Sequence, residues 1–147
     1  MKKSKRIQPL VKLAEQDEQR KAMTLREQQH KLQQEQDRLA AMHNYKREYR
    51  QGIDNEAQQG INAQRMFHLI RFTEQLDRLV LKQHQVISEC ERVLAQRMAA
   101  WQQANGRYQA LKNASHRLRQ AELALAAKQE QNEIDELVTQ RYHHRGT

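Results

Sequence analysis

Histidine, cysteine and the acidic residues are the side chains of this sequence that could bind a metal ion. The chain has seven histidines and a single cysteine, Cys90. No two histidines form an HExxH pair, and Cys90 has no second cysteine at ligand spacing. His143 and His144 are adjacent, so on a helix their side chains would point about 100° apart. We therefore predict no metal site, and we interpret the histidines as solvated and Cys90 as a small packing residue.

Neither a nucleotide site nor a catalytic pair is indicated. The patterns GxxxxGK[ST] and GxGxxG, whose glycines let backbone amides surround phosphates, do not occur. The eighteen acidic residues are interleaved with basic ones, as on a solvated helix face. Catalytic groups need a concave pocket that excludes water, and a thin helical protein has no interior large enough to form one. We expect no enzyme activity, no catalytic residues and no cofactor.

The composition predicts helix almost everywhere. Only 37% of the residues are hydrophobic and the mean hydropathy is −1.10, which is too polar for the thick core of a globular enzyme. Disordered chains are usually rich in proline, glycine and serine, whereas this chain has one proline and four glycines. Gln, Glu, Lys, Arg, Ala and Leu dominate, and these residues lose little rotamer freedom in a helix. We expect a thin, single domain over residues 1–147.

Charge and cysteine content bound the environment. The formal net charge is +8, and basic residues gather near both ends, among them Lys2, Lys3, Arg141 and Arg145. Such ends suit an acidic protein, anionic lipid or nucleic acid, and solvated tails are an equally good interpretation. One cysteine fits a reducing compartment. No run of about eighteen apolar residues occurs, so we expect a cytosolic protein without membrane insertion.

Hydrophobic periodicity predicts a long helix in the second half of the chain. Between Leu76 and Leu125, core positions can be placed at alternate steps of four and three residues, and eleven of these fifteen positions are apolar. An unpatterned chain of this composition would give about five or six. A 3.5-residue repeat specifies a left-handed supercoil with a partner helix. The repeat passes unbroken through Asn105 and Gly106, so we predict one helix over residues 61–141.

The first half predicts the partner helix. Leu25, Leu32 and Leu39 are seven residues apart, within a helix expected over residues 5–51. Pro9 is tolerated there if it lies in the first turn. Residues 52–60 contain two glycines and lose the heptad phase, which predicts the turn. A short connection forces the helices to run antiparallel, so the expected fold is an all-α, antiparallel two-helix coiled-coil hairpin.

The two predicted helices differ in length. At 1.5 Å per residue they span about 70 Å and about 120 Å, which leaves about 50 Å of the second helix without a partner in the chain. The apolar repeat nevertheless continues through Leu111, Leu118 and Leu125. Each leucine gains about 1.5–3 kcal/mol only when it is buried. We therefore expect a second copy of the chain or a different protein to cover this end.

Four aromatic residues lie within a few helical turns of the predicted turn: Tyr45, Tyr49, Phe67 and Phe72. A two-helix core admits one side chain per layer from each helix, so four rings together with Leu76 and Leu79 overfill it. We expect about half of this cluster to be core and the rest to be exposed. Exposed aromatic groups mark contact sites for other proteins.

In the order and spacing of its motifs the chain resembles the flagellar export protein FliJ family. The matching elements are Leu10 to Glu15, Tyr45-x-x-Glu48-Tyr49, Gly60-Ile61, Phe72-x-x-x-Leu76, Trp101, and Ile134 to Leu137 with Arg141. Three alternatives stay open. One is the stalk protein of a virulence-type secretion system, which shares the architecture. Another is a basic coiled coil that binds nucleic acid, although acids interrupt every basic stripe. The third is a self-assembling structural rod.

The resemblance implies a set of partners and sites. It implies docking in the ring of the flagellar export ATPase, contact with the membrane export-gate protein, and escort of export chaperones, on the cytoplasmic side of the inner membrane at the flagellar base. No nucleic acid is expected as a partner. The gate contact maps onto Met42, Tyr45, Tyr49, Phe72, Leu76, Leu79 and Gln83. Docking in the ATPase ring is expected at Leu10, Leu13, Leu111, Leu118 and Leu125.

Overall fold

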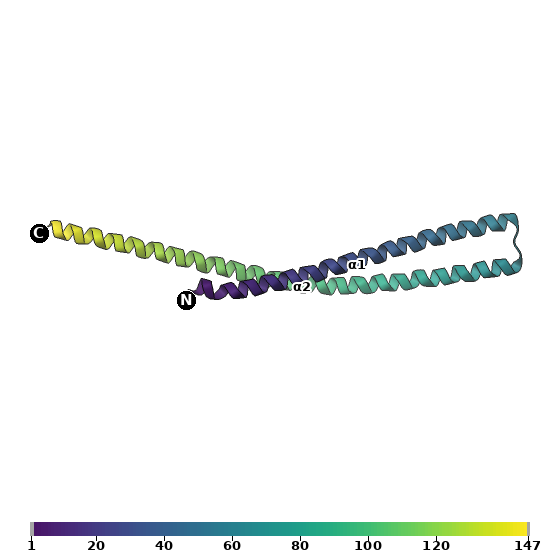
Figure 1. Cartoon of the computed structure of the whole chain (residues 1–147), viewed down its shortest axis with the longest axis horizontal. Helices are drawn as coiled ribbons and strands as arrows, with labels where there is room; N and C mark the ends of the chain where they lie inside the picture. Colours follow the sequence, from purple (N-terminus) through teal and green to yellow (C-terminus); the bar gives the residue numbers. More distant parts are fainter. Residues whose placement is uncertain (1, 147) are drawn as a thin grey trace. The chain divides into compact units, whose positions relative to one another are not determined.

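Two long helices make up nearly all of the computed structural model, which describes residues 2–146. Helix α1 runs from Lys3 to Gln59 and helix α2 from Ala63 to Arg145. No strand occurs among the described residues. The helices run antiparallel beside each other and are joined at one end by residues 60–62 (Figure 1). The predicted antiparallel two-helix coiled-coil hairpin is therefore confirmed, as is the continuous helix through Asn105 and Gly106.

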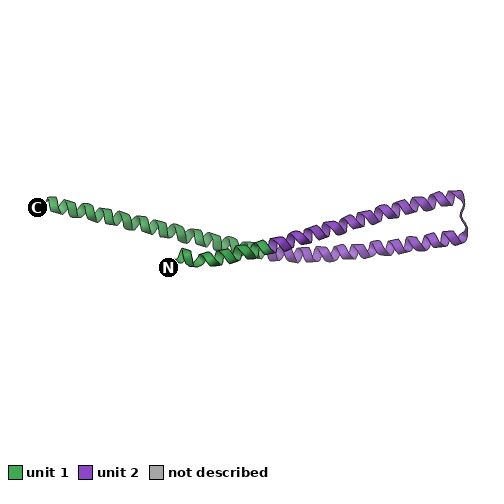
Figure 2. Cartoon of the chain, viewed as in Figure 1, with its two compact units in different colours: residues 1–20, 102–147 green, residues 21–101 purple. Residues whose placement is uncertain are grey.

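The hairpin divides into two compact units, and each contains a part of both helices (Figure 2). Unit 1 comprises residues 1–20 and 102–147, and unit 2 comprises residues 21–101. Unit 2 contains the turn and the aromatic cluster, whereas unit 1 contains both chain ends. The prediction of a single domain stays a prediction.

The apolar repeat of α2 is the face that packs on α1. Every predicted core position from Leu76 to Glu122 is buried or half-buried, and only Leu125 is exposed. Ile87, Cys90 and Ala104 are among the most buried residues of the chain. Cys90 is a free thiol within this core, as its place in the repeat predicted.

Helix α1 supplies the matching core positions, and several of them are polar. The buried residues Ala14, Gln28 and Glu35 are separated from one another by multiples of seven residues. Ser4 and Leu25, also buried, form a second series with the same spacing. The heptad repeat of α1 is thus as regular as that of α2. Its signal in the sequence is weaker than that of α2, because polar residues occupy several of its core positions.

Hydrogen bonds between the helices fix one register in unit 2. The Gln28 amide donates to the Cys90 carbonyl at 3.0 Å, and the Gln83 amide donates to the Glu35 carbonyl at 2.9 Å. The residue numbers of both pairs add up to 118, as a single antiparallel register requires. Among the described residues no buried side-chain nitrogen or oxygen lacks a partner. Pairing of the helices in this register therefore satisfies these polar layers.

The turn is shorter than predicted, since α1 continues through Gly52 to Gln59. Gly52 is exposed within the helix, where a glycine costs only about 1 kcal/mol relative to alanine. Gly60 ends α1 with a φ of 85°, which favours glycine. The Asn62 side-chain oxygen then accepts a hydrogen bond from the Arg65 amide at 2.8 Å and caps the start of α2. The expected turn at residues 52–60 is corrected to residues 60–62.

Helix α1 begins earlier than expected, so the prediction that Pro9 lies in the first turn is wrong. The helix starts at Lys3, which places Pro9 in its second turn, where it cannot donate to the Lys5 carbonyl. The first turn holds no acidic residue of its own. Instead Glu122 of α2 accepts a hydrogen bond from the Ser4 amide at 3.1 Å and another from the Ser4 hydroxyl. A carboxylate from the opposite helix thus caps α1.

The unpaired end of α2 is shorter than expected, because α1 is longer than expected. Within unit 1, α1 covers α2 as far as Glu122, and Leu111 and Leu118 are half-buried. Only residues 123–145, about 35 Å of helix, extend beyond the first turn of α1. All of these residues are exposed. We call residues 123–145 the C-terminal extension.

Candidate functional site

The aromatic cluster near the turn combines packed and exposed rings. Tyr49 of α1 and Phe72 of α2 are half-buried and meet across the hairpin with ring centroids 4.6 Å apart. Tyr45 stacks on Tyr49 at 6.5 Å and is 50% exposed. Phe67 is 58% exposed, and the Arg71 guanidinium lies over its ring at 5.8 Å. The expectation that about half of the cluster is core and the rest is exposed is confirmed.

An ion pair closes the hairpin beside this cluster. Arg65 at the start of α2 donates two hydrogen bonds of 3.2 Å to the Glu56 carboxylate near the end of α1. The hydrogen bond to Glu56 raises the pKa of Arg65. Together with the Asn62 cap, this pair holds the ends of the two helices in a defined geometry. The exposed rings therefore stand on an ordered support.

The seven residues predicted to contact the export gate do not share one environment. Tyr45 and Leu79 are exposed, whereas Met42, Tyr49, Phe72 and Leu76 are half-buried and Gln83 is buried. The Gln83 amide donates to the Glu35 carboxylate at 2.6 Å, and that carboxylate also pairs with Arg38 at 3.4 Å. In this arrangement Gln83 holds the helices together and presents no surface to a partner.

A groove runs along the hairpin between the two helices at this patch. It has a volume of about 570 Å³ and an apolar surface that includes Met42, Leu79 and Val86. Lys31 and Lys82 also line it. Val86 is 42% exposed and was not predicted as a site residue. An apolar groove lined by amino groups suits a protein segment that carries apolar and acidic side chains.

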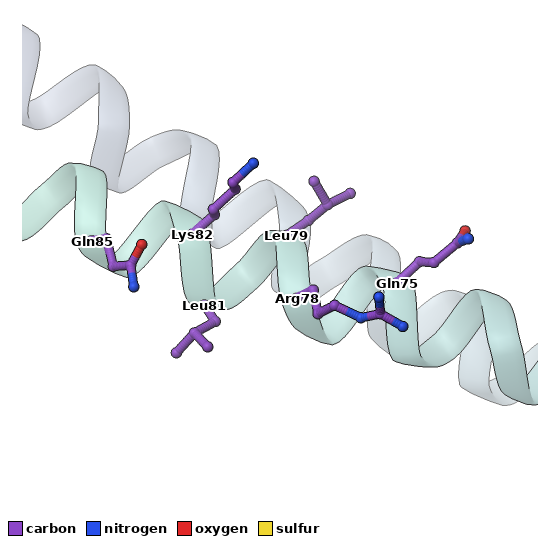
Figure 3. Close-up of a pocket in the computed structure, with 6 residues that line it drawn as sticks. All are labelled: Gln75, Arg78, Leu79, Leu81, Lys82 and Gln85. Atoms are coloured by element: carbon purple, nitrogen blue, oxygen red, sulfur yellow. The ribbon is translucent and has the colours of Figure 1, made fainter.

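A second depression lies on α2 and shares Leu79, Lys82 and Gln85 with the groove. Its volume is about 550 Å³, and its remaining lining residues are Gln75, Arg78 and Leu81. Leu79 and Leu81 extend from different sides of α2, with Arg78 between them (Figure 3). Sequence reasoning missed Leu81, although a signal was present. In the run Leu79-Val80-Leu81 only Val80 occupies a core position, so its neighbours must point away from α1.

Basic residues cover the other flank of α1 near the turn. His43, Lys46, Arg47 and Arg50 line a depression of about 330 Å³. The rings of His43 and His84 meet across the hairpin with centroids 6.2 Å apart, and Lys46 forms an ion pair with Asp77 of α2. This flank differs from the groove in having no large apolar side chain among its lining residues.

The residues predicted to dock in the ATPase ring also divide by exposure. Leu10, Leu13 and Leu125 are exposed, at 50%, 62% and 58%. Leu111 and Leu118 are half-buried core positions of unit 1. The structure therefore brings Leu111 and Leu118 into the contact with α1 and leaves the other three available to a partner.

Metal-binding clusters and membrane-spanning segments are both absent from the described residues. Residues 2–146 contain no group of three or more His, Cys, Asp or Glu side chains placed to hold a metal ion. None of the described helices has a stretch long and apolar enough to cross a bilayer.

An antiparallel helical hairpin with an ordered core and exposed aromatic and aliphatic groups near its turn defines a coiled-coil protein suited to binding other proteins. Comparison with known families assigns it more closely. The family model described as "Flagellar FliJ protein" matches residues 2–147, and the chain belongs to this family. The search of curated proteins and the search of solved structures gave no match. The chain is therefore associated with flagellar protein export, in a family of non-catalytic components, as the resemblance implied.

Proposed function

We propose that this protein acts in the flagellar type III export apparatus by binding several of its components and catalyses no reaction itself. In this proposal the surface near the turn contacts the membrane export-gate protein. The opposite end of the hairpin docks in the export ATPase ring. The hairpin also escorts export chaperones, and the gate contact holds it at the cytoplasmic side of the inner membrane at the flagellar base. Family membership and the placement of exposed apolar groups support the proposal.

One observation carries the gate contact: Tyr45 is exposed on top of an ordered ring pair. Tyr49 and Phe72 pack against each other, and Tyr45 stacks on Tyr49. Binding hot spots are enriched in tyrosine and combine large apolar area with a rigid support. Leu79 and the adjoining groove extend the apolar area. Met42, Tyr49, Phe72 and Leu76 then form the base of the surface, and Gln83 positions it through Glu35.

The gate contact is tested by separating stability from affinity. We expect Tyr45→Ala to leave thermal melting almost unchanged and to weaken binding of a cytoplasmic gate fragment by about 2 kcal/mol or more. Phe72→Ala should lower the melting temperature, because it removes a half-buried ring. Tyr142, which is 79% exposed in the C-terminal extension, gives the matched control Tyr142→Ala. If Tyr45→Ala and Tyr142→Ala bind the fragment equally well, the gate assignment is wrong.

Docking in the ATPase ring is proposed for the other end of the hairpin. Leu10, Leu13 and Leu125 are the exposed members of the predicted set, and Leu111 and Leu118 support them from the core. We expect the triple variant Leu10→Ser, Leu13→Ser, Leu125→Ser to lose stimulation of the export ATPase while circular dichroism shows unchanged helix. Leu118→Ser should instead lower the melting temperature. Normal stimulation by the folded triple variant would refute the docking assignment.

Chaperone escort is proposed at the level of the whole hairpin, without a defined surface. It rests on family membership. Affinity purification of the tagged full chain should recover export chaperones without their substrates bound. Recovery of the ATPase and the gate protein without any chaperone would remove this part of the proposal.

A further inference from the structure

Charge is segregated along the last part of α2. From Arg107 to Arg119 the helix has four Lys or Arg residues and no Asp or Glu. From Glu130 to Glu136 it has four Asp or Glu residues and no Lys or Arg. Both segments belong to unit 1 (Figure 2). An antiparallel second copy of α2 would therefore place its acidic segment beside the basic one of the first copy, and its basic segment beside the acidic one.

Charged and apolar side chains of these segments share one face of α2. At 100° per residue they all fall within about 60° of Lys112, whereas the core residues Leu111 and Leu118 lie about 100–120° away from it. Every residue of this face is exposed in the single chain. The face comprises Lys112, His116, Arg119, Leu123, Glu130, Glu133, Ile134 and Leu137. It therefore continues from the paired region into the C-terminal extension, and α1 does not cover it.

The basic half of this face borders a groove between α1 and α2. The groove has a volume of about 540 Å³ and is lined by basic side chains of both helices, among them Lys12, Lys112 and Arg119. The half-buried Val11 contributes apolar surface, and Glu15 is the one acid among its lining residues. No ion pair within the described residues involves Lys12, Lys112 or Arg119. The groove therefore suits a helix that carries acidic and apolar side chains.

We propose that this face of α2 pairs two copies of the chain in an antiparallel dimer. The C-terminal extension of each copy lies along unit 1 of the other, so that residues 130–137 of one copy face residues 112–119 of its partner. The contact is isologous, because the same pairs form twice about a two-fold axis between Leu123 and Ala126. Alanine occupies positions 124, 126 and 127 near this axis, and such small side chains let two helices approach closely.

The chemistry of the face selects a second copy as the occupant. Leu123, Ile134 and Leu137 are 65%, 47% and 61% exposed and gain free energy only when a partner buries them. The acidic and basic segments match each other in reverse order, so an antiparallel copy pairs both at once. A parallel copy would bring like charges together. Nucleic acid, or an unrelated acidic helix, would pair the basic segment and leave the acidic one unpaired.

This dimer goes beyond the proposed docking in the ATPase ring and uses other residues. Leu125 lies about 140° around α2 from Lys112, and neither Leu10 nor Leu13 lines the groove. The triple variant Leu10→Ser, Leu13→Ser, Leu125→Ser should therefore dimerise like the wild type. Its effect on the ATPase bears only on the docking assignment.

The test is sedimentation velocity of the full chain over a dilution series. We expect the wild type to pass from monomer to dimer as its concentration rises, and added salt should weaken the dimer. The double variants Glu130→Lys, Glu133→Lys and Lys112→Glu, Arg119→Glu should each weaken self-association at least tenfold, because each brings like charges together in both halves of the contact. An equimolar mixture of the two variants should form a heterodimer, since one chain is then basic in both segments and the other acidic in both.

The matched control is the double variant Asp135→Lys, Glu136→Lys. It makes the same change of charge in the same segment, but these two positions lie about 120–140° around α2 from Lys112. It should self-associate like the wild type. Melting is compared on dilute protein, in which the single chain leaves Glu130 and Leu137 exposed, and should stay near that of the wild type for all variants.

Each result supports or overturns a part of the proposal. A wild type that stays monomeric up to its solubility limit would overturn the dimer. Equal weakening by the Asp135, Glu136 control would show that net charge, and not this face, governs association. If the mixture of the two charge-reversed variants stays monomeric, the antiparallel pairing of acidic with basic segments is overturned.

Discussion

Helix α2 has two regions that use their apolar residues in opposite ways. From Leu69 to Glu122 its core positions are buried or half-buried against α1. In the C-terminal extension, after Glu122, every residue is exposed, including Leu123, Ile134 and Leu137. The two regions belong to one uninterrupted helix, so helix propensity does not distinguish them. The difference lies in what covers them.

The apolar face of α2 also changes side between these regions. At 100° per residue, Leu123, Ile134 and Leu137 fall within about 60° of one another, about 120° around the helix from Leu111 and Leu118, whereas the exposed Leu125 stays in line with that earlier pair. A helix that continued in line with α1 would therefore miss this second stripe. The stripe of Leu123, Ile134 and Leu137 therefore does not continue the hairpin core. The residues of this second stripe suit a partner that approaches from another direction than α1.

The largest effect should come from truncating a core leucine in the paired region. Leu69 is only 4% exposed, so Leu69→Ala leaves a cavity and should lower the free energy of unfolding by about 2–5 kcal/mol. Leu137→Ala removes the same atoms from an exposed position and should change it by about 0.5 kcal/mol or less. Urea unfolding followed by circular dichroism measures both. Equal destabilisation by the two variants would show that the C-terminal extension is buried in the folded protein in solution.

Removing a polar core layer should have the next largest effect. Gln83→Ala removes the hydrogen bonds that α2 donates to the buried Glu35 carboxylate and carbonyl, which should cost about 1–3 kcal/mol. The double variant Glu35→Leu, Gln83→Leu replaces the layer by apolar groups and should be as stable as the wild type or more so. We expect it to lose specificity for the hairpin and to form oligomers, measured by light scattering. A strictly monomeric double variant would show that this layer does not select the pairing.

The sequence was sufficient for the fold because the α2 repeat is apolar at most core positions. It also indicated that the aromatic cluster would be partly exposed, since four rings exceed what two helices can bury. It was insufficient for α1, where Ser4, Gln28 and Glu35 are core residues only because specific residues of α2 satisfy them. Their partners lie 118, 62 and 48 residues away in sequence, and no local pattern reveals such pairs.

Local sequence patterns also misplace the turn, and motif resemblance does not separate the buried from the exposed residues of the predicted site. Two glycines and the lost heptad phase predict a turn over residues 52–60, yet α1 continues through Gly52 and ends only at Gly60, whose φ is positive. Asn62 is a favourable N-cap residue, but its signal is weak because Arg65 stands where a capping box would have Glu or Gln. Among the site residues, heptad position separates the buried Gln83 from the exposed Leu79, whereas motif resemblance alone treats them alike.

A smaller effect is expected at the Asn62 cap. Asn62→Ala removes the acceptor for the Arg65 amide and should lower the free energy of unfolding by about 1 kcal/mol. Asn62→Asp should retain the cap and restore stability, because aspartate accepts the same hydrogen bond. The measurement is the urea midpoint of the three proteins. Should Asn62→Asp unfold at the same midpoint as Asn62→Ala, the side-chain cap contributes nothing to the turn.

The smallest effect should be a pH dependence at the boundary between the paired region and the C-terminal extension. Hydrogen bonds from the Ser4 hydroxyl and, to a smaller extent, from the Ser4 amide lower the pKa of the Glu122 carboxyl below its ordinary value of 4.5. Because the folded pKa is lower than the unfolded one, the carboxylate stabilises the fold fully above about pH 4.5 and loses this contribution as the pH falls through the folded pKa. The Glu122→Gln variant should therefore melt at a lower temperature than the wild type at pH 7, and this difference should shrink as the pH falls below about 4.5. The control is Glu130→Gln, which changes an exposed acid of the C-terminal extension and should leave the pH profile unchanged. Parallel melting curves for wild type and Glu122→Gln at every pH would mean that the Ser4 contact does not form in solution, and the start of the C-terminal extension would then lie nearer the turn.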